Sequence, residues 1–264
     1  MKQRIITAVI AAALFIPFVV YGKWPFAVLV FAMAAVGFFE ILRMKKIAIT
    51  SVPGVLGGIA LAGLLLPTSW AQTVEDVTTL GKMEIIFFAF ILLLVYTVVI
   101  KNTFTFDDVG FIMASVFYVG LGFHYFIETR FIGLEFVVFA LLIVWTTDSG
   151  AYFVGRKLGK NKLWPEISPN KTIEGFVGGI VIAVIFASVM QFLHPITSSW
   201  LALIAVTIVA SIFGQMGDLV ESAIKRHYDV KDSGTLLPGH GGILDRFDSL
   251  LFVLPLLHFL QFVG

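Results

Sequence analysis

Residues 174–193 read EGFVGGIVIAVIFASVMQFL, a run in which Glu174 is followed by 19 uncharged positions. A helix of about 20 largely apolar residues has the length that crosses the hydrocarbon core of a bilayer. Similar runs recur along the chain, whose 264 residues are 59% hydrophobic and only 13% charged. Soluble domains contain roughly 45–50% apolar residues. The sequence therefore predicts an all-α, polytopic integral membrane protein.

Nine apolar runs, each bounded by charged residues, Pro or Gly, are expected to be transmembrane helices. They are residues 5–21, 25–42, 55–70, 84–100, 109–126, 131–147, 174–193, 200–219 and 249–262. The first run follows Lys2 and Arg4, as the apolar part of a secretory signal would. It is longer than the roughly 7–15 apolar residues of such a signal. A retained first span is therefore favoured over a cleaved signal.

The basic residues predict the orientation, because cytoplasmic loops of membrane proteins are enriched in Lys and Arg. With nine spans and a cytoplasmic N-terminus, 15 of the 18 basic residues fall on the inner side. The other three are Lys23, Lys82 and Arg130. We expect the C-terminus outside and a single membrane domain over 1–264. Within it, spans without chemical motifs occupy 1–130, and the motifs lie in 131–264.

The charged residues also narrow the classes of function. The net charge is +1, and no basic segment interleaved with aromatic residues is present, which argues against nucleic-acid binding. The chain has no Cys, so disulfides and thiolate metal sites are excluded. Charged residues are dense only in residues 156–171 and 218–248. The function should be sought in these two segments.

The stronger local signal lies in residues 215–248, which read QMGDLVESAIKRHYDVKDSGTLLPGHGGILDRFD. Asp218, Glu221, Ser222 and Lys225 have the spacing of one helix face. A solvated helix end with a few salt bridges would show the same spacing. Asp218, however, lies at or inside the apolar boundary, where ionisable residues by default indicate a functional site.

A glycine-rich turn follows that helix. Gly241 and Gly242 permit close approach of a ligand to backbone amides, and His240 can donate to a phosphate. A tight turn back into the membrane is the alternative explanation. Asp245 and Asp248 are three residues apart, so their carboxylates can converge on a helix. The flanking charges favour a phosphate-binding turn.

Carboxylates and basic residues in this segment together suit a magnesium–phosphate site. Mg²⁺ takes one or two protein carboxylates plus phosphate oxygens, and basic side chains neutralise the remaining phosphate charge. The basic side chains available for this are Lys225, Arg226, Lys231 and Arg246. A zinc site is disfavoured, because His227 and His240 have no partner at the usual ligand spacing.

The second cluster begins where the sixth predicted span ends. It contains Asp148 at the membrane boundary and Lys171 shortly before the seventh span. Ser168-Pro169, followed by Thr172 and Glu174, also resembles a helix start stabilised by an acidic first turn. Capping explains part of this segment, although it does not explain Asp148.

These residues carry a family resemblance. Ser222-x-x-Lys225-Arg226, Lys231-Asp232, Pro238-Gly239-His240-Gly241-Gly242 and Asp245-Arg246-x-Asp248 resemble the signature of the phosphatidate cytidylyltransferases, or CDP-diacylglycerol synthases. Asp148, Ala151-Tyr152, Gly155-Arg156 and Ile167-Ser168-Pro169-x-Lys171-Thr172-x-Glu174-Gly175 resemble the other segment shared by that family. Together these motifs cover about the C-terminal half of the chain.

The resemblance implies a nucleotidyltransferase of phospholipid biosynthesis, which converts CTP and phosphatidate into CDP-diacylglycerol and pyrophosphate. It implies a homodimer in the inner (plasma) membrane with its active site on the cytoplasmic side. We expect Mg²⁺ on Asp218, Asp245 and Asp248, and the carboxylate count allows a second cation. The residues expected to be catalytic are Asp218, Lys225, Asp245 and Asp248. The residues expected to contact substrate are Asp148, Lys171, Ser222, Arg226, Lys231, His240, Gly241, Gly242 and Arg246.

Three other classes of function would also place charged residues in a membrane domain. A CTP-dependent lipid kinase of the phytol or dolichol kinase type would transfer the γ-phosphate in place of CMP. A CDP-alcohol phosphatidyltransferase is less well supported, because its Asp-Gly-x-x-Ala-Arg pattern is not found. A transporter would bind near the membrane midplane, commonly between internal repeats. Neither feature is apparent in the sequence.

Overall fold

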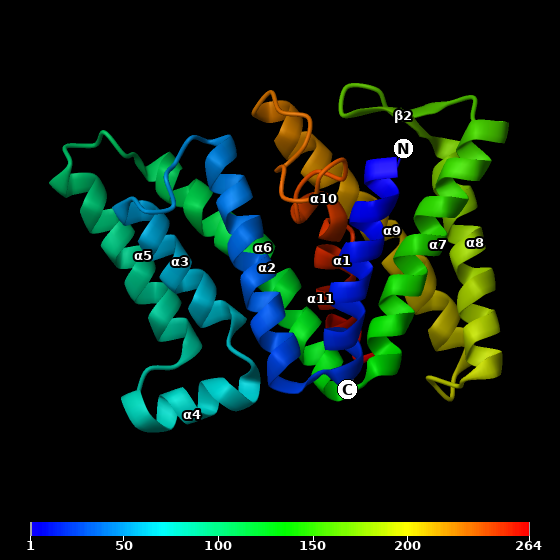
Figure 1. The fold of residues 1–264 in the computed structure, drawn as a ribbon, viewed down its shortest axis with the longest axis horizontal. Coiled ribbons are helices and arrows are strands. Elements are labelled where there is room, and N and C mark those ends of the chain that lie inside the picture. Colours follow the sequence, from blue (N-terminus) through cyan, green and yellow to red (C-terminus); the bar gives the residue numbers. More distant parts are fainter. Residues whose placement is uncertain (1, 264) are drawn as a thin grey trace. The chain divides into compact units, whose positions relative to one another are not determined.

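The computed structural model describes residues 2–263 and is built almost wholly from helices (Figure 1). The helices are α1 (Lys2–Tyr21), α2 (Lys23–Met44), α3 (Val52–Leu65), α4 (Thr68–Thr78), α5 (Lys82–Val99), α6 (Phe106–Ile132), α7 (Leu134–Leu158), α8 (Ile173–Leu193), α9 (Trp200–His227), α10 (Leu244–Phe247) and α11 (Leu250–Phe259). Two short strands, β1 (Lys162–Trp164) and β2 (Ser168–Thr172), lie between α7 and α8. The predicted all-α class is confirmed except for these strands.

The helices agree with a multi-pass membrane protein. Among residues 2–263, six helices are long and apolar enough to cross a membrane: α2, α5, α6, α7, α8 and α9. A seventh is obtained if α3 and α4 together count as one span. Helix α11 and the described apolar part of α1 are shorter. Every one of the nine predicted runs overlaps a helix, but the count of nine and the orientation of the termini stay predictions.

The third predicted span, residues 55–70, is wrong at its C-terminal end. Helix α3 ends at Leu65, and α4 leaves it at an angle of 113°. The cause is Pro67, because a proline pushes the residue before it out of the helical region. Leu66 accordingly has an extended ψ of 125°. Trp70, expected at the end of a span, lies instead on α4, which has no buried residue.

The chain divides into two compact units, which are described separately. The first contains the residues up to Glu128 together with Asp232–Leu244, and the second contains Thr129–Lys231 and the residues from Asp245 onward. Whether the chain forms the predicted single domain over 1–264 stays a prediction, and its end residues Met1 and Gly264 lie outside the described part. In the first unit, the core includes Phe26 and Phe126, whose rings meet edge-on at 5.1 Å.

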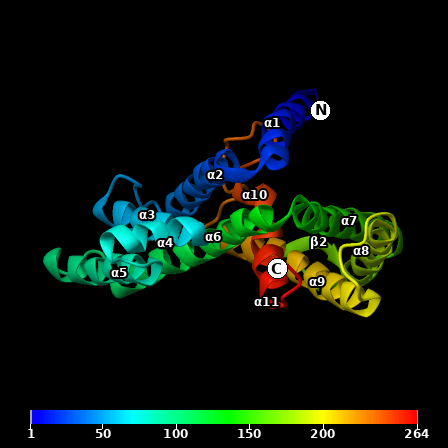
Figure 2. The same cartoon turned by 90° about the horizontal axis from the view of Figure 1, so that it is seen from below.

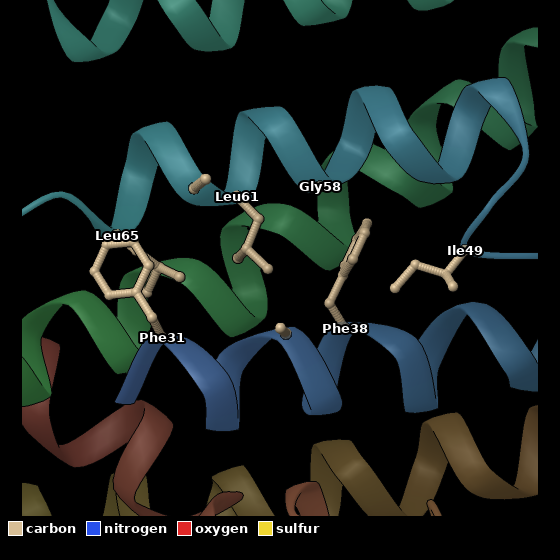
Figure 3. Close-up of a pocket in the computed structure, with 8 residues that line it drawn as sticks. Phe31, Phe38, Ile49, Gly58, Leu61 and Leu65 are labelled. Carbon is tan, nitrogen blue, oxygen red and sulfur yellow. The ribbon is translucent and has the colours of Figure 1, made fainter. Parts of the chain in front are cut away.

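An apolar cavity of about 110 Å³ lies between α2 and α3 of the first unit (Figure 3). Phe31 and Phe38 of α2 face Leu61 and Leu65 of α3 across it. All eight residues that line the cavity are apolar. A cavity without polar groups offers no chemistry, so the candidate site must lie among the charged residues.

In the second unit, α7 and α8 run side by side (Figures 1 and 2). Small residues recur every four positions on the buried face of α8: Gly175, Gly179, Ala183 and Ala187. Such small-xxx-small faces let helix backbones approach closely in membranes. A Cβ on Gly179 would lie only 2.7 Å from the carbonyl oxygen of Thr147 in α7. The close packing therefore fixes the first turns of α8 against the part of α7 that carries Asp148.

The segment between α7 and α8 forms a hairpin in which Lys162 pairs with Thr172 and Trp164 pairs with Ser168. The expected helix start at Ser168 is therefore wrong, because residues 168–172 are extended. Thr172 is the residue that caps α8, and its hydroxyl accepts from the Gly175 amide. Glu174 lies in the first turn as expected, but its carboxylate accepts from the backbone amides of Lys160 and Asn161.

Candidate active site

Three helices of the second unit are tied together beside the predicted site residues. Thr147 Oγ1 of α7 and Ser211 Oγ of α9 form a buried hydrogen bond of 2.8 Å. Gln215 of α9 donates through Nε2 to the Phe176 carbonyl of α8 at 3.2 Å. Asp148 follows Thr147 directly in the chain. These bonds therefore fix the segment of α7 that carries Asp148. They also fix the segment of α9 that carries Asp218, one turn after Gln215.

Asp218 of α9 is the centre of the first charged group. Its Oδ2 forms an ion pair of 2.6 Å with Lys171 Nζ, which is carried by β2. Its Oδ1 accepts from Ser222 Oγ at 3.3 Å. Asp148 lies within electrostatic range of both Asp218 and Lys171. The prediction that Asp148 and Lys171 bring α7 and the start of α8 to the residues of α9 is therefore consistent with the geometry.

Lys225 is the centre of the second charged group. Its Nζ donates to Glu221 Oε2 and to Asp245 Oδ1, each at 2.7 Å. All three side chains are largely buried, with relative exposures of 13%, 2% and 6% in the order Lys225, Glu221 and Asp245. A buried ammonium is stable only when it is paired and hydrogen-bonded, and the two carboxylates meet that requirement.

The expected common helix face on α9 is confirmed by these contacts. Helix α9 continues to His227, and hydrogen bonds join Ser222 to Asp218 and Lys225 to Glu221. Both pairs have the i, i+4 spacing at which helical side chains meet. The periodicity of the sequence was sufficient to predict this face.

Asp248 lies between α10 and α11, next to the same groups. Its Oδ1 accepts from the Ser249 amide at 2.6 Å. Burial raises the pKa of the Asp248 carboxyl, and the negative charges of Asp218 and Asp148 raise it further. Lys225 opposes this effect by lowering it. Three carboxylates from α7, α9 and the α10–α11 turn thus share one electrostatic environment.

The donor set suits a hard cation, although the carboxylates are not arranged as a finished metal site. Asp, Glu and phosphate oxygens are the ligands that Mg²⁺ prefers. Glu221 Oε1 is buried and has no hydrogen-bond partner among the described residues. Within residues 2–263, however, no three His, Asp or Glu side chains converge closely enough to form a ready ligand group. Lysines hold Asp218 and Asp245 in ion pairs instead.

The remaining basic residues predicted to contact substrate are more exposed. Arg226 Nε makes a long contact of 3.5 Å with the Ile167 carbonyl of the hairpin. Lys231 and Arg246 have exposed side chains. Their exposed positions make these side chains accessible to an anionic ligand.

The glycine-rich turn belongs to the first unit. Gly239 and Gly241 have positive φ values of 78° and 84°, a backbone conformation that glycine adopts readily. The Leu237 amide donates to the Gly241 carbonyl at 3.0 Å, and the His240 amide donates to the Leu237 carbonyl at 2.8 Å. His240 and Gly241 therefore sit in a compact turn, and the buried Gly242 follows them.

Glu40 of α2 was not predicted to be a site residue, and the structure places it against this turn. Its carboxylate accepts from the backbone amides of Ile243 and Leu244 at 2.9 and 3.0 Å and from Ser233 Oγ at 3.1 Å. The available signal was its charge within the apolar run 25–42. An ionisable residue inside a predicted span is by default a functional hypothesis.

Comparisons with known proteins agree with the motifs. Residues 2–263 match the sequence pattern of the Cytidylyltransferase family. The chain is 56% identical over 263 residues to the phosphatidate cytidylyltransferase of Bacillus subtilis, covering 98% of this chain and 97% of the relative. It is 49% identical over 260 residues to the protein of that name from Staphylococcus epidermidis, and 46% identical over 263 residues to that of Staphylococcus aureus, each with 98% of both chains covered.

Proposed function

Because the chain belongs to the cytidylyltransferase family, we propose that it is a phosphatidate cytidylyltransferase, an enzyme that converts CTP and phosphatidate into CDP-diacylglycerol and pyrophosphate. The observation that carries the proposal is the grouping of Asp148, Asp218 and Asp248 with Lys171 and Lys225 in a helical membrane protein. The carboxylates suit a divalent cation, and the ammonium groups suit the phosphates of a nucleoside triphosphate and of a lipid.

The chemistry of the substrates explains why this site needs charge more than it needs a base. A phosphate monoester has a second pKa of about 6, so phosphatidate is largely a dianion near pH 7. One of its oxygens attacks the α-phosphorus of CTP, and the bond from that phosphorus to the pyrophosphate oxygen breaks. The protein must then position the two phosphates and offset the charge that develops on them. Lys171, Arg226, Lys231 and Arg246 are suited to the second task.

Asp218, Asp245 and Asp248 would hold Mg²⁺ in this proposal. When bound, the cation supplies positive charge at the phosphate oxygens, and a second cation can be accommodated by the same carboxylates. The mutual repulsion of Asp148, Asp218 and Asp248 and the unpartnered Glu221 Oε1 support a cation at this position. Mg²⁺ dependence of turnover, measured after removal of divalent ions with a chelator, tests this part of the proposal.

The site would lie on the cytoplasmic side of the plasma membrane, where CTP from solution and phosphatidate from the bilayer can meet. The excess of basic residues on the predicted inner segments supports this orientation, with nine spans and an outer C-terminus. Because the chain has no Cys, single introduced cysteines report topology directly. Lys160→Cys should resist an impermeant thiol reagent in intact cells, whereas Thr197→Cys should react. The reverse pattern would refute the orientation.

We also propose a homodimer, as the family resemblance implies. Light scattering of the purified protein in detergent should give the protein mass of two 29.0 kDa chains. A mass of one chain at all concentrations would contradict it.

The decisive experiment follows the label from CTP into lipid. Purified protein with phosphatidate, Mg²⁺ and α-labelled CTP should form labelled CDP-diacylglycerol, while γ-labelled CTP should yield labelled pyrophosphate only. Label entering lipid from the γ position alone would instead indicate a CTP-dependent lipid kinase. Movement of lipid across vesicles without any chemistry would indicate a transporter.

A further inference from the structure

Glu40 is the only charged residue in the apolar run 25–42, and the residue is 2% exposed. It lies in the last part of α2, which is one of the helices long enough to cross a membrane. Burial of a carboxylate is costly unless hydrogen bonds compensate for the lost solvation. The hydrogen bonds of Glu40 therefore indicate which part of the structure this buried carboxylate stabilises.

Three hydrogen bonds join Glu40 to one segment about 200 positions further along the chain. The Ile243 amide donates to Oε1 at 2.9 Å, while the Leu244 amide and Ser233 Oγ donate to Oε2 at 3.0 and 3.1 Å. A single carboxylate thus holds both ends of the turn at 233–244. Hydrogen bonds to a charged acceptor are stronger than neutral ones, so this clamp is a firm one.

The turn is closely fitted around the carboxylate. A Cβ on Gly242 would collide with Glu40 Oε1 and with Ser233 Oγ, and a Cβ on Gly234 would collide with the same carboxylate oxygen. Glycines at 234 and 242 are therefore required by the presence of Glu40. A substitution at Gly234 should disturb the turn less once the carboxylate is removed, whereas a Cβ at position 242 would still collide with Ser233 Oγ.

Immediately after the clamped residues comes Asp245. The Leu244 amide that donates to Glu40 belongs to the first residue of α10, and Asp245 and Arg246 are the next two residues. Fixing the backbone at Ile243 and Leu244 limits the positions from which α10 can begin. The conformation of α10 in turn limits where the Asp245 carboxylate can be.

We propose that Glu40 is a positioning residue of the enzyme, which holds the 233–244 turn so that α10 presents Asp245 and Arg246 to the substrates. The inference rests on the proposed function for its catalytic consequence. It assigns a role to the N-terminal half of the chain, in which no chemical motif is found. Glu40 itself touches neither the substrate nor the reacting atoms in this proposal.

The test variant is Glu40→Gln, which keeps the shape of the side chain but places an amide group against backbone donors. We expect kcat to fall about 10-fold to 100-fold, the range that small misplacements of catalytic groups produce, with KM for phosphatidate unchanged. Hydrogen exchange at the amides of Ile243 and Leu244 should become at least about 10-fold faster, because their acceptor is weakened. A purely structural role would lower the thermal stability without this split between kcat and KM.

Glu128→Gln is the matched control. Glu128 Oε1 also accepts from a backbone amide in the first unit, that of Thr68 at 2.6 Å, and it holds the start of α4 in place. This variant should leave kcat and the exchange of the 243–244 amides at their wild-type values. If Glu40→Gln behaves in the same way, the proposal is overturned.

A second variant guards against loss of folding. Ser233 lies in a loop, and Ser233→Ala removes one hydrogen bond to the Glu40 carboxylate. This variant should lower kcat about 3-fold to 10-fold and speed hydrogen exchange at the Leu244 amide. Unchanged exchange in Ser233→Ala, together with an unfolded Glu40→Gln, would refute the inference. Inactivity of the wild-type protein toward CTP and phosphatidate would instead refute the proposed function, while the exchange measurements would still decide whether Glu40 holds the turn.

Discussion

Lys171 and Lys225 both neutralise aspartates in the second unit, but their surroundings differ. The Lys171–Asp218 pair has side-chain exposures of 27% and 33%, whereas Lys225 sits between two carboxylates that are almost wholly buried. The nitrogen–oxygen distances are nearly the same, at 2.6 and 2.7 Å. The two groups therefore have similar ion-pair distances but differ in solvation and in the number of carboxylates around the lysine.

That difference predicts different roles for the two lysines. Part-exposed ion pairs contribute about 0–1 kcal/mol, so Lys171 can leave Asp218 at little cost when a phosphate and a cation arrive. Removing one partner of a buried pair costs about 3–5 kcal/mol, because the other charge is left uncompensated. Lys171 is suited to move from Asp218 to a phosphate of the substrate. Lys225 is suited to hold α10 against α9.

The largest effect should come from Lys225→Met, which breaks the buried group. Glu221 and Asp245 would then lose the ammonium group that lies between them, and we expect a loss of about 3–5 kcal/mol of stability together with all turnover. Thermal unfolding in detergent measures the loss. The double variant Lys225→Met/Glu221→Gln should recover part of the stability but no activity. A stable single variant would show that the group is not structural.

Asp218→Asn should have the next largest effect, and it acts on activity alone. We expect turnover to fall at least about 100-fold, since a proposed carboxylate ligand of Mg²⁺ is lost. The free energy of unfolding should change by less than about 1 kcal/mol, because the Asp218 pair is part-exposed. Asp245→Asn should also abolish turnover, but with a clear loss of stability. Near-normal turnover in either variant would remove that residue from the proposed metal site.

The same contrast explains what could be predicted from the sequence. The helix face with Asp218, Glu221, Ser222 and Lys225 follows from local periodicity, and it was predicted correctly. The partner of Asp218 is Lys171, which is 47 positions away, and no spacing rule selects it. Long-range pairing depends on how α7, α8 and α9 pack. The sequence shows this packing only as small residues on α8.

Two errors have local causes that outweighed the hydropathy pattern. The run at 55–70 is free of charged residues, but Pro67 breaks its helix, and mean hydropathy does not detect a break in the backbone. The segment before α8 contains Ser168 and Pro169, which suggested a helix start, yet pairing of β2 with β1 makes it extended. Glu40 was not predicted as a site residue because the hydropathy of residues 25–42 is high despite its charge, so the run was interpreted only as a membrane span.

The smallest effect, and the most specific one, should come from Lys171→Ala. We expect KM for CTP to rise about 10-fold, equivalent to about 1.4 kcal/mol of lost phosphate binding, with stability lowered by no more than about 1 kcal/mol. Lys45→Ala is the matched control, because Lys45 pairs with Asp108 at 2.6 Å with similar exposures of 26% and 21%. Lys45 also lies over the Phe111 ring, so its removal should cost at least as much stability. Its kinetics should nevertheless stay at the wild-type values. If the two variants show the same kinetics, Lys171 only forms a surface ion pair with Asp218. Its proposed movement from Asp218 to the triphosphate is then wrong.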